Sequence, residues 1–171
     1  RRSGAGRWRV GSSSSKPLLK PMAELYHQVW IGAPSATVYE AISTEAGIAG
    51  WWDRPTTVKT DSGAVLQFNP GPEHGVLRAR VAAAIPDRRI EWEFASTHPR
   101  NSPAFAWTGT RVSFEITRRA VPPWATERAD TAIVDFRHSG WDERSEYLGF
   151  CNFAWGEALQ KLKQWCEARA T

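Results

Sequence analysis

Apolar and polar positions follow a helical period most clearly near the C-terminus, in residues 141–170. Apolar residues recur there every three or four positions and therefore share one face of a helix. The members of this stripe are Leu148, Cys151, Trp155, Leu159, Leu162 and Cys166. The pattern predicts a helix from about residue 143 to residue 168, roughly 40 Å long. A helix of this length with one apolar stripe needs a broad surface on which to lie, and its first turns could roof a cavity.

Before this helix, apolar and polar residues alternate with a period of two, which predicts β-strands. The clearest case is residues 89–95, where Trp92 and Phe94 face one way and Glu91 and Glu93 face the other. Further strands are predicted at residues 24–31, 56–60, 64–69, 76–85, 109–117 and 131–138. Because the spacings between strands are short and favour hairpins, the strands should form one antiparallel sheet.

Two short helices are predicted between the first and second strands. Pro34 opens the first helix or Ser35 is its N-cap, and the helix runs to Ser43. The second short helix runs towards Trp51 and Trp52. This order of elements predicts an α+β fold, in which a curved antiparallel sheet of about six or seven strands wraps round the long C-terminal helix.

Charge separates an N-terminal tail from a single domain. Residues 1–23 contain six Arg and Lys residues and no acidic residue, and the whole chain has a net charge of +4. The rest of the chain has 16 basic residues against 18 acidic ones, a net charge of −2. We interpret residues 1–22 as a disordered basic tail, either an artefact upstream of a natural start at Met22 or a transit peptide, and residues 23–171 as one domain.

Charge and hydropathy argue against two classes of partner. The domain lacks the basic excess of a nucleic-acid-binding fold, so we predict no nucleic acid partner. No apolar run approaches the ~18 residues that span a bilayer, so we predict no membrane partner.

Cys151 and Cys166 lie about 22 Å apart on the predicted helix and cannot form a disulfide with each other. This cysteine usage predicts a reducing compartment, the cytoplasm, while the sequence leaves monomer and homodimer open.

A search for catalytic and metal-binding motifs yields one polar candidate, His138. No Cys pair has zinc spacing, no glycine-rich phosphate loop follows a strand and no GxSxG elbow occurs, so we predict neither a metal nor a cofactor. Strand alternation places His138 on the inward face with Val134 and Phe136. It could orient a ligand or act as a general base, or it could make a structural hydrogen bond.

Ten Trp residues are unusual in a chain of 171 residues, and they indicate either large core layers or a lined pocket. Trp51 and Trp52 end the pair of short helices, where at least one should face inward at a cavity mouth or as a plug. Most other candidates lie on inward strand faces or in the first turns of the long helix. The residues predicted to line a cavity are Trp51, Trp52, Phe68, Trp92, Phe94, Trp107, Phe114, Phe136, His138, Leu148, Cys151 and Trp155.

Six stretches of the sequence together resemble a known superfamily in their order and spacing. They are IGAPSATVYEAIS, GIAGWWD, RRIEWEF, GTRVSFEI, TAIVDFRHSGW and FAWGEALQKLKQWCE. They extend from Glu24 to about Ala168 and resemble the helix-grip superfamily of START-like, polyketide cyclase and birch-pollen-allergen-like proteins, often called SRPBCC. The branch that they resemble is named after the activator of the heat-shock protein 90 ATPase. The resemblance implies the helix-grip fold, with a cavity between the sheet and the long helix for a small, mostly apolar ligand.

The resemblance implies less about activity, because one fold hosts many functions. Members of this superfamily include lipid carriers, cyclases and chaperone activators. We expect binding of a small hydrophobic or aromatic ligand without defined catalysis. One alternative is an enzyme of the polyketide cyclase or hydratase type, with His138 as its acid–base group. The other alternative is a partner of heat-shock protein 90 that uses its outer face.

Overall fold

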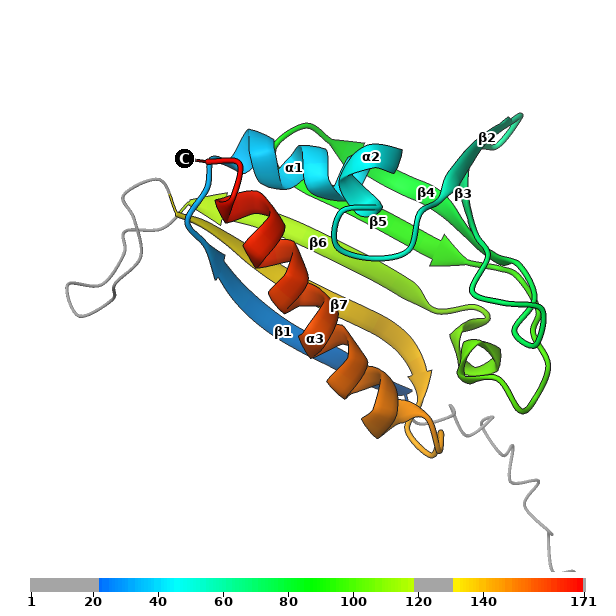
Figure 1. Cartoon of the computed structure of the whole chain (residues 1–171). Helices are drawn as coiled ribbons and strands as arrows, with labels where there is room; N and C mark the ends of the chain where they lie inside the picture. Colours follow the sequence, from blue (N-terminus) through cyan, green and yellow to red (C-terminus); the bar gives the residue numbers. More distant parts are fainter. Residues whose placement is uncertain (1–21, 119–130, 171) are drawn as a thin grey trace, which may run out of the picture.

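The computed structural model describes residues 22–118 and 131–170, and seven antiparallel strands in these ranges form one curved sheet round a long helix (Figure 1). The strands are β1 (Met22–Ile31), β2 (Thr56–Thr60), β3 (Gly63–Phe68), β4 (Leu77–Ile85), β5 (Arg89–Phe94), β6 (Arg111–Arg118) and β7 (Ala132–Asp142). The helices are α1 (Ser35–Ser43), α2 (Glu45–Ile48), the 3-10 helix η1 (Pro103–Trp107) and α3 (Leu148–Glu167). The predicted α+β class, with its antiparallel sheet and two short helices after the first strand, is confirmed.

The first strand of the sheet begins inside the segment that we interpreted as a tail. Met22 is the first residue of β1 and pairs with Asp142 at the end of β7. The interpretation of residues 1–21 as a disordered tail lies outside the described residues.

The sheet joins the beginning of the described chain to its last strand. Its strand order is β1-β7-β6-β5-β4-β3-β2, so every strand from β2 to β6 pairs with the next strand along the chain. Only β1 departs from this rule among the described strands, because it pairs along the length of β7. The chain then crosses from β1 at one edge to β2 at the other edge through α1 and α2 (Figure 1). These two helices therefore lie near one end of α3, on the same side of the sheet.

The long helix begins later than the hydrophobic pattern predicted. α3 starts at Leu148 rather than near residue 143, because β7 continues to Asp142 in its pairing with β1. A turn follows, in which the Ser145 N–H donates to the Asp142 carbonyl oxygen at 2.9 Å. From Cys151 to Cys166 the predicted apolar stripe is buried beneath the helix, whereas Leu148 is half-buried.

The two short helices are separated by a new helix start at Thr44. α1 begins at Ser35 with extended Pro34 at its N-cap, one residue away from both predicted starts. The Thr44 hydroxyl accepts a hydrogen bond from the Gly47 N–H at 2.9 Å and so caps α2. A side chain at Gly47 would place its Cβ 2.2 Å from the Glu40 carbonyl oxygen, so only glycine allows this close approach of the helices. The tight connection fixes where the chain leaves α2.

Charged side chains pair with one another on the outer face of the sheet. Arg111 contacts Glu91 at 3.1 Å and Glu93 at 3.0 Å, and Arg80 also pairs with Glu93. The hydrogen bond from Arg111, then that from Arg80, lowers the pKa of the Glu93 carboxyl. Exposed pairs contribute little to stability individually, and here only Glu91 among the four partners is buried. The apolar chemistry of the protein therefore lies on the inner face.

Candidate functional site

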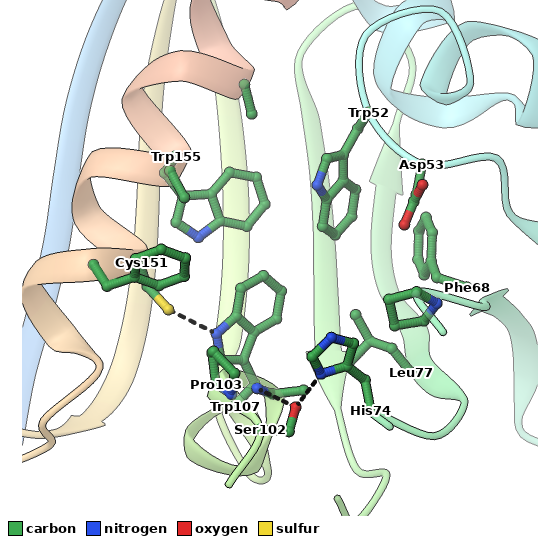
Figure 2. A pocket seen from close by; sticks show the side chains of 15 residues that line it. Trp52, Asp53, Phe68, His74, Leu77, Ser102, Pro103, Trp107, Cys151 and Trp155 are labelled. Carbon is green, nitrogen blue, oxygen red and sulfur yellow. Dashed lines mark hydrogen bonds between the residues drawn. The ribbon is translucent and has the colours of Figure 1, made fainter. Parts of the chain in front are cut away.

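A pocket lies at the end of the interior where α3 begins, between α3, the residues after α2 and the segment that carries η1 (Figure 2). Its volume is about 290 Å³. This value is just below the ~300–1,000 Å³ of most small-molecule sites. The residues that line it are Trp52, Asp53, Phe68, Pro70, His74, Leu77, Ser102, Pro103, Ala104, Trp107, Phe150, Cys151, Ala154, Trp155 and Ala158.

The structure divides the residues that were predicted to line a cavity into two groups. Those in the pocket wall are Trp52, Phe68, Trp107, Cys151 and Trp155. Those buried in the core outside the wall are Trp51, Trp92, Phe94, Phe114, Phe136 and His138. Leu148 is half-buried in the first turn of α3 and does not line the pocket. The pocket is thus shorter than the full gap between sheet and helix.

Aromatic rings fill the middle of that gap. Ring centroids are 5.2 Å apart for Trp92 and Phe114, and 5.2 Å apart for Phe114 and Phe136. Phe136 in turn lies 4.5 Å from the ring of Trp155 on α3. These separations are those of directly packed aromatic pairs. The middle of the interior is therefore a solid core.

Trp51 and Trp52 follow α2 and take different roles. The backbone N–H groups of both residues donate to the Ile48 carbonyl oxygen, which fixes their positions after the helix. Trp51 is 3% exposed, and its ring N–H donates to the Ala41 carbonyl oxygen at 2.8 Å. Trp52 is half-buried and lines the pocket. One indole therefore plugs the end of the core, while its neighbour forms part of the pocket wall.

Three indoles from separate parts of the chain meet at the pocket. The ring centroids of Trp107 and Trp155 are 5.5 Å apart, with an angle of 18° between the ring planes. Trp52 lies 6.1 Å from Trp107 and 5.2 Å from Trp155, and Figure 2 shows these rings around the cavity. Phe68 packs against Trp52 at 4.7 Å. These rings present a broad apolar surface to anything that enters.

His138 lies behind the pocket, and both of its ring nitrogens have partners. An indole N–H can only donate, so the 3.0 Å contact from Trp155 makes Nδ1 of His138 an acceptor and places the proton on Nε2. Nε2 then donates to the Thr110 hydroxyl at 2.8 Å, and that hydroxyl donates to the Trp107 carbonyl oxygen at 2.6 Å. Burial lowers the pKa of His138 to about 3. This arrangement keeps the ring neutral and uses it to connect β7 and α3 to Thr110, the residue before β6.

Cys151 contributes a thiol to the pocket wall. Its Sγ accepts a hydrogen bond from the ring N–H of Trp107 at 3.4 Å, as Figure 2 shows. Burial raises the pKa of this thiol, although the Trp107 bond acts in the opposite direction. A protonated thiol is a weak nucleophile. Cys151 therefore serves as a small apolar group of the wall that holds Trp107 in place.

The sequence did not single out the polar side of the pocket, which contains His74 and Ser102. Nδ1 of His74 lies 2.9 Å from Oγ of Ser102, and Nε2 lies 3.3 Å from a carboxylate oxygen of Glu73. The Ser102 hydroxyl also accepts from the Ala104 N–H at 3.2 Å and caps η1. A carboxylate on Nε2 favours the proton there, so Nδ1 accepts from the Ser102 hydroxyl. Residues 28 positions apart in the chain thus form one hydrogen-bonded group.

A second histidine holds the segment that carries His74. Nδ1 of His98 donates to the His74 carbonyl oxygen at 2.7 Å, and Nε2 of His98 lies 2.9 Å from the Ser96 hydroxyl. Gly71 has a φ of +132°, and the Glu73 carboxylate occupies the space that a side chain at Gly71 would need. Adjacent Gly and Pro residues in the PGPEHG loop are the signal that could have indicated a shaped segment here.

Asp53 is a carboxylate on the pocket wall opposite α3, next to Trp52 and Phe68 in Figure 2. It is exposed, and no hydrogen bond or ion pair of its side chain is found among the described residues. The neighbouring Arg54 acts on Glu45, where its charge helps to lower the carboxyl pKa after the larger effect of Thr57. The Asp53 charge therefore remains available to whatever occupies the pocket.

Metal-binding groups and membrane spans were also sought in the part of the chain that the structure describes. No cluster of three or more His, Cys, Asp or Glu residues in this part has the arrangement of a metal site. Within the same residues, no helix has the length and apolar character needed to cross a membrane.

Comparison with solved structures identifies the fold. No protein-family model matches the sequence, and no curated protein matches it. The chain is similar to the solution structure of the Aha1 dimer from Colwellia psychrerythraea, with 25% identity and a TM-score of 0.66 over 85% of this chain and 96% of that chain. The chain has the helix-grip fold. The predicted resemblance to the helix-grip superfamily, and to its branch named after the chaperone ATPase activator, Aha1, is confirmed.

Two further structures share the helix-grip fold at lower identity. CalU16 from Micromonospora echinospora is 14% identical, with a TM-score of 0.61 over 84% of this chain and 75% of that chain. DynU16, from the dynemicin biosynthetic locus, is 15% identical, with a TM-score of 0.62 over 86% of this chain and 48% of that chain. At these identities the likeness concerns the fold alone.

Proposed function

We propose that this protein binds a small hydrophobic or aromatic molecule in the pocket at the start of α3. The observation that carries the proposal is the wall of indoles from Trp52, Trp107 and Trp155 around a cavity of about 290 Å³. An apolar cavity with a few polar groups is the usual form of a small-molecule site. The helix-grip fold, which the chain shares with the Aha1 structure, supports the same function, because the sequence resemblance to this superfamily implies a cavity for a small, mostly apolar ligand.

Filling the pocket tests this proposal. Ala154 lines the cavity on α3, so Ala154→Phe should occupy it with a ring. Ala168 is exposed at the far end of the same helix, and Ala168→Phe serves as the matched control. Small aromatic alcohols should raise the melting temperature of the wild type and the control, since a ligand of the native state stabilises it, and should leave Ala154→Phe unchanged. Equal thermal shifts for all three proteins would refute binding at this pocket.

Native mass spectrometry of the freshly isolated protein identifies the natural occupant. A bound mass that is present in the wild type and absent from Ala154→Phe is expected.

A cytoplasmic location remains a prediction from the two free thiols, both of which are buried.

A second candidate function is acid–base catalysis on the bound molecule, which the Ser102–His74–Glu73 group favours. A histidine within hydrogen-bond reach of a hydroxyl and oriented by a carboxylate is a common acid–base arrangement. His138 was the acid–base candidate of the sequence, but it is fully buried outside the pocket wall, and Thr110 and Trp155 occupy its two nitrogens. If the occupant is turned over, His74→Gln should abolish turnover while ligand binding persists, and unchanged turnover would remove this candidate.

A chaperone partner is the third candidate, favoured by the 25% identity to Aha1. Binding to heat-shock protein 90 through the outer face of the sheet would involve the paired charged side chains around Arg111 and Glu93. Pull-down with purified heat-shock protein 90 tests it, with charge reversal at Arg111 as the variant expected to lose binding. Retention by neither the wild type nor the variant would exclude this partner.

A further inference from the structure

The formal charges on the pocket wall have one sign. Among the fifteen lining residues, Asp53 is the only one with a carboxylate, and none is Lys or Arg. Glu73 adds a second carboxylate directly behind His74, 3.3 Å from its ring. The nearest cation along the chain, Arg54, acts on Glu45 instead. An occupant therefore meets the Asp53 carboxylate and no Lys or Arg side chain in the described pocket wall.

The aromatic wall acts in the same direction as these carboxylates. The faces of indole rings are negative and attract cations within about 6 Å. Trp52, Trp107 and Trp155 bring three such rings within 5.2–6.1 Å of one another at the cavity. The same rings repel a bound carboxylate or phosphate. A site without a Lys or Arg partner would also leave such an anion unpaired when desolvated, which is costly.

We infer that the pocket selects a small aromatic amine, protonated at neutral pH, over the alcohol or acid of the same shape. Its ring would lie against the indole wall, and its ammonium group would lie at Asp53. This inference rests on the proposed ligand-binding function and adds the chemical class of the ligand. It also assigns Asp53 as the residue that determines the charge preference, because its carboxylate has no other partner among the described residues.

Three matched probes test the inference by isothermal titration calorimetry. Phenethylamine is cationic, phenethyl alcohol is neutral and phenylacetate is anionic, while the aromatic body is the same. The amine should bind about tenfold more tightly than the alcohol, a difference of about 1.4 kcal/mol, and phenylacetate should bind most weakly. Raising the salt concentration should weaken amine binding and leave alcohol binding unchanged, since salt screens a partly exposed charge pair.

Two variants test whether Asp53 determines the preference for the amine. Asp53→Asn should lower the affinity for phenethylamine to that for the alcohol while keeping the alcohol affinity. Asp61 is exposed in the turn between β2 and β3, so Asp61→Asn is a matched control that should bind all three probes as the wild type does. Circular dichroism of both variants checks that each one is folded.

The possible outcomes separate this inference from the proposed function. If the alcohol binds and phenylacetate binds as tightly as the amine or more tightly, the inference fails while the ligand-binding function stands. If the amine preference survives in Asp53→Asn, the role of Asp53 fails. If none of the probes binds the wild type at millimolar concentrations while Ala154→Phe and wild type melt identically with every apolar compound tested, both proposals fail.

Discussion

The closed middle of the interior and the pocket at its end are built from the same residue types, aromatic rings with one histidine each. In the middle, His138 is fully buried, and both ring nitrogens bond to side chains of the core. At the end, His74 is half-buried and bonds to Ser102 and to the exposed Glu73. The partners of a histidine, rather than its place on a regular strand, therefore decide whether it holds a core together or faces a cavity.

Trp51 and Trp52 should give the largest contrast between the two regions. Trp51→Ala removes a buried indole and its bond to the Ala41 carbonyl, and it should lower the free energy of unfolding by about 4 kcal/mol. Trp52→Ala should cost about 2 kcal/mol, because Trp52 already borders a cavity, and it should enlarge the pocket. Urea denaturation measures both values. Equal losses would show that Trp52 belongs to the closed core.

The pH dependence of stability should isolate His138. Its pKa is about 3 in the folded protein, against about 6.5 in the unfolded chain, so the unfolded state binds a proton first as the pH falls. The associated stability is complete above pH ~6.5 and is lost progressively towards pH 3, by about 3 kcal/mol at pH ~4. The His138→Gln variant should lack this part of the dependence, as shown by urea denaturation across this range. His74→Gln should retain it, and a flat wild-type profile would contradict the neutral, buried state of His138.

Thr110→Val interrupts the series of hydrogen bonds that runs from Trp155 through His138 and Thr110 to the Trp107 carbonyl oxygen. The substitution keeps the shape but leaves Nε2–H of the buried His138 without its acceptor, so unfolding should become easier by about 2 kcal/mol. Thr108→Val also removes one hydroxyl bond, to the Ser96 carbonyl oxygen, but at an exposed position, and should cost about 0.5 kcal/mol. Similar costs for the two variants would argue that the chain through His138 is not a special feature of the core.

The periodic parts of the sequence predicted the fold well, and they also explain where prediction stopped. Alternation along β5 and the stripe from Cys151 to Cys166 predicted the sheet and the helix face that packs on it. Alternation also placed His138 inside, but it could not show that Trp155 and Thr110 would bind both of its nitrogens. The period of a pattern shows on which face of a strand or helix a residue lies. It does not show whether the space on that face is filled by other side chains or left open as a pocket.

The polar side of the pocket could not be predicted, because its members come from loops without a period. His74 lies in the β3–β4 connection and Ser102 lies 28 positions later in the β5–β6 connection, so the two meet only in the folded chain. Asp53 follows two tryptophans at the end of the helical pair, and no pattern in the sequence distinguishes it from an ordinary solvent-exposed carboxylate. Loop residues of this kind acquire chemistry from the scaffold that positions them.

The smallest effect on stability is expected at His74, where the effect on binding should be clear. His74→Ala removes part of the pocket wall and the partner of Ser102, and it should change the free energy of unfolding by about 1 kcal/mol or less. The affinity for phenethyl alcohol, measured by calorimetry, should fall about fivefold, because the probe loses wall contacts. His27 is also half-buried, bonds to Asn152 at 3.0 Å and lies outside this pocket, so His27→Ala should match the stability change and keep the affinity. If His27→Ala weakens binding as much as His74→Ala does, the distinction between the pocket and the rest of the interior is lost.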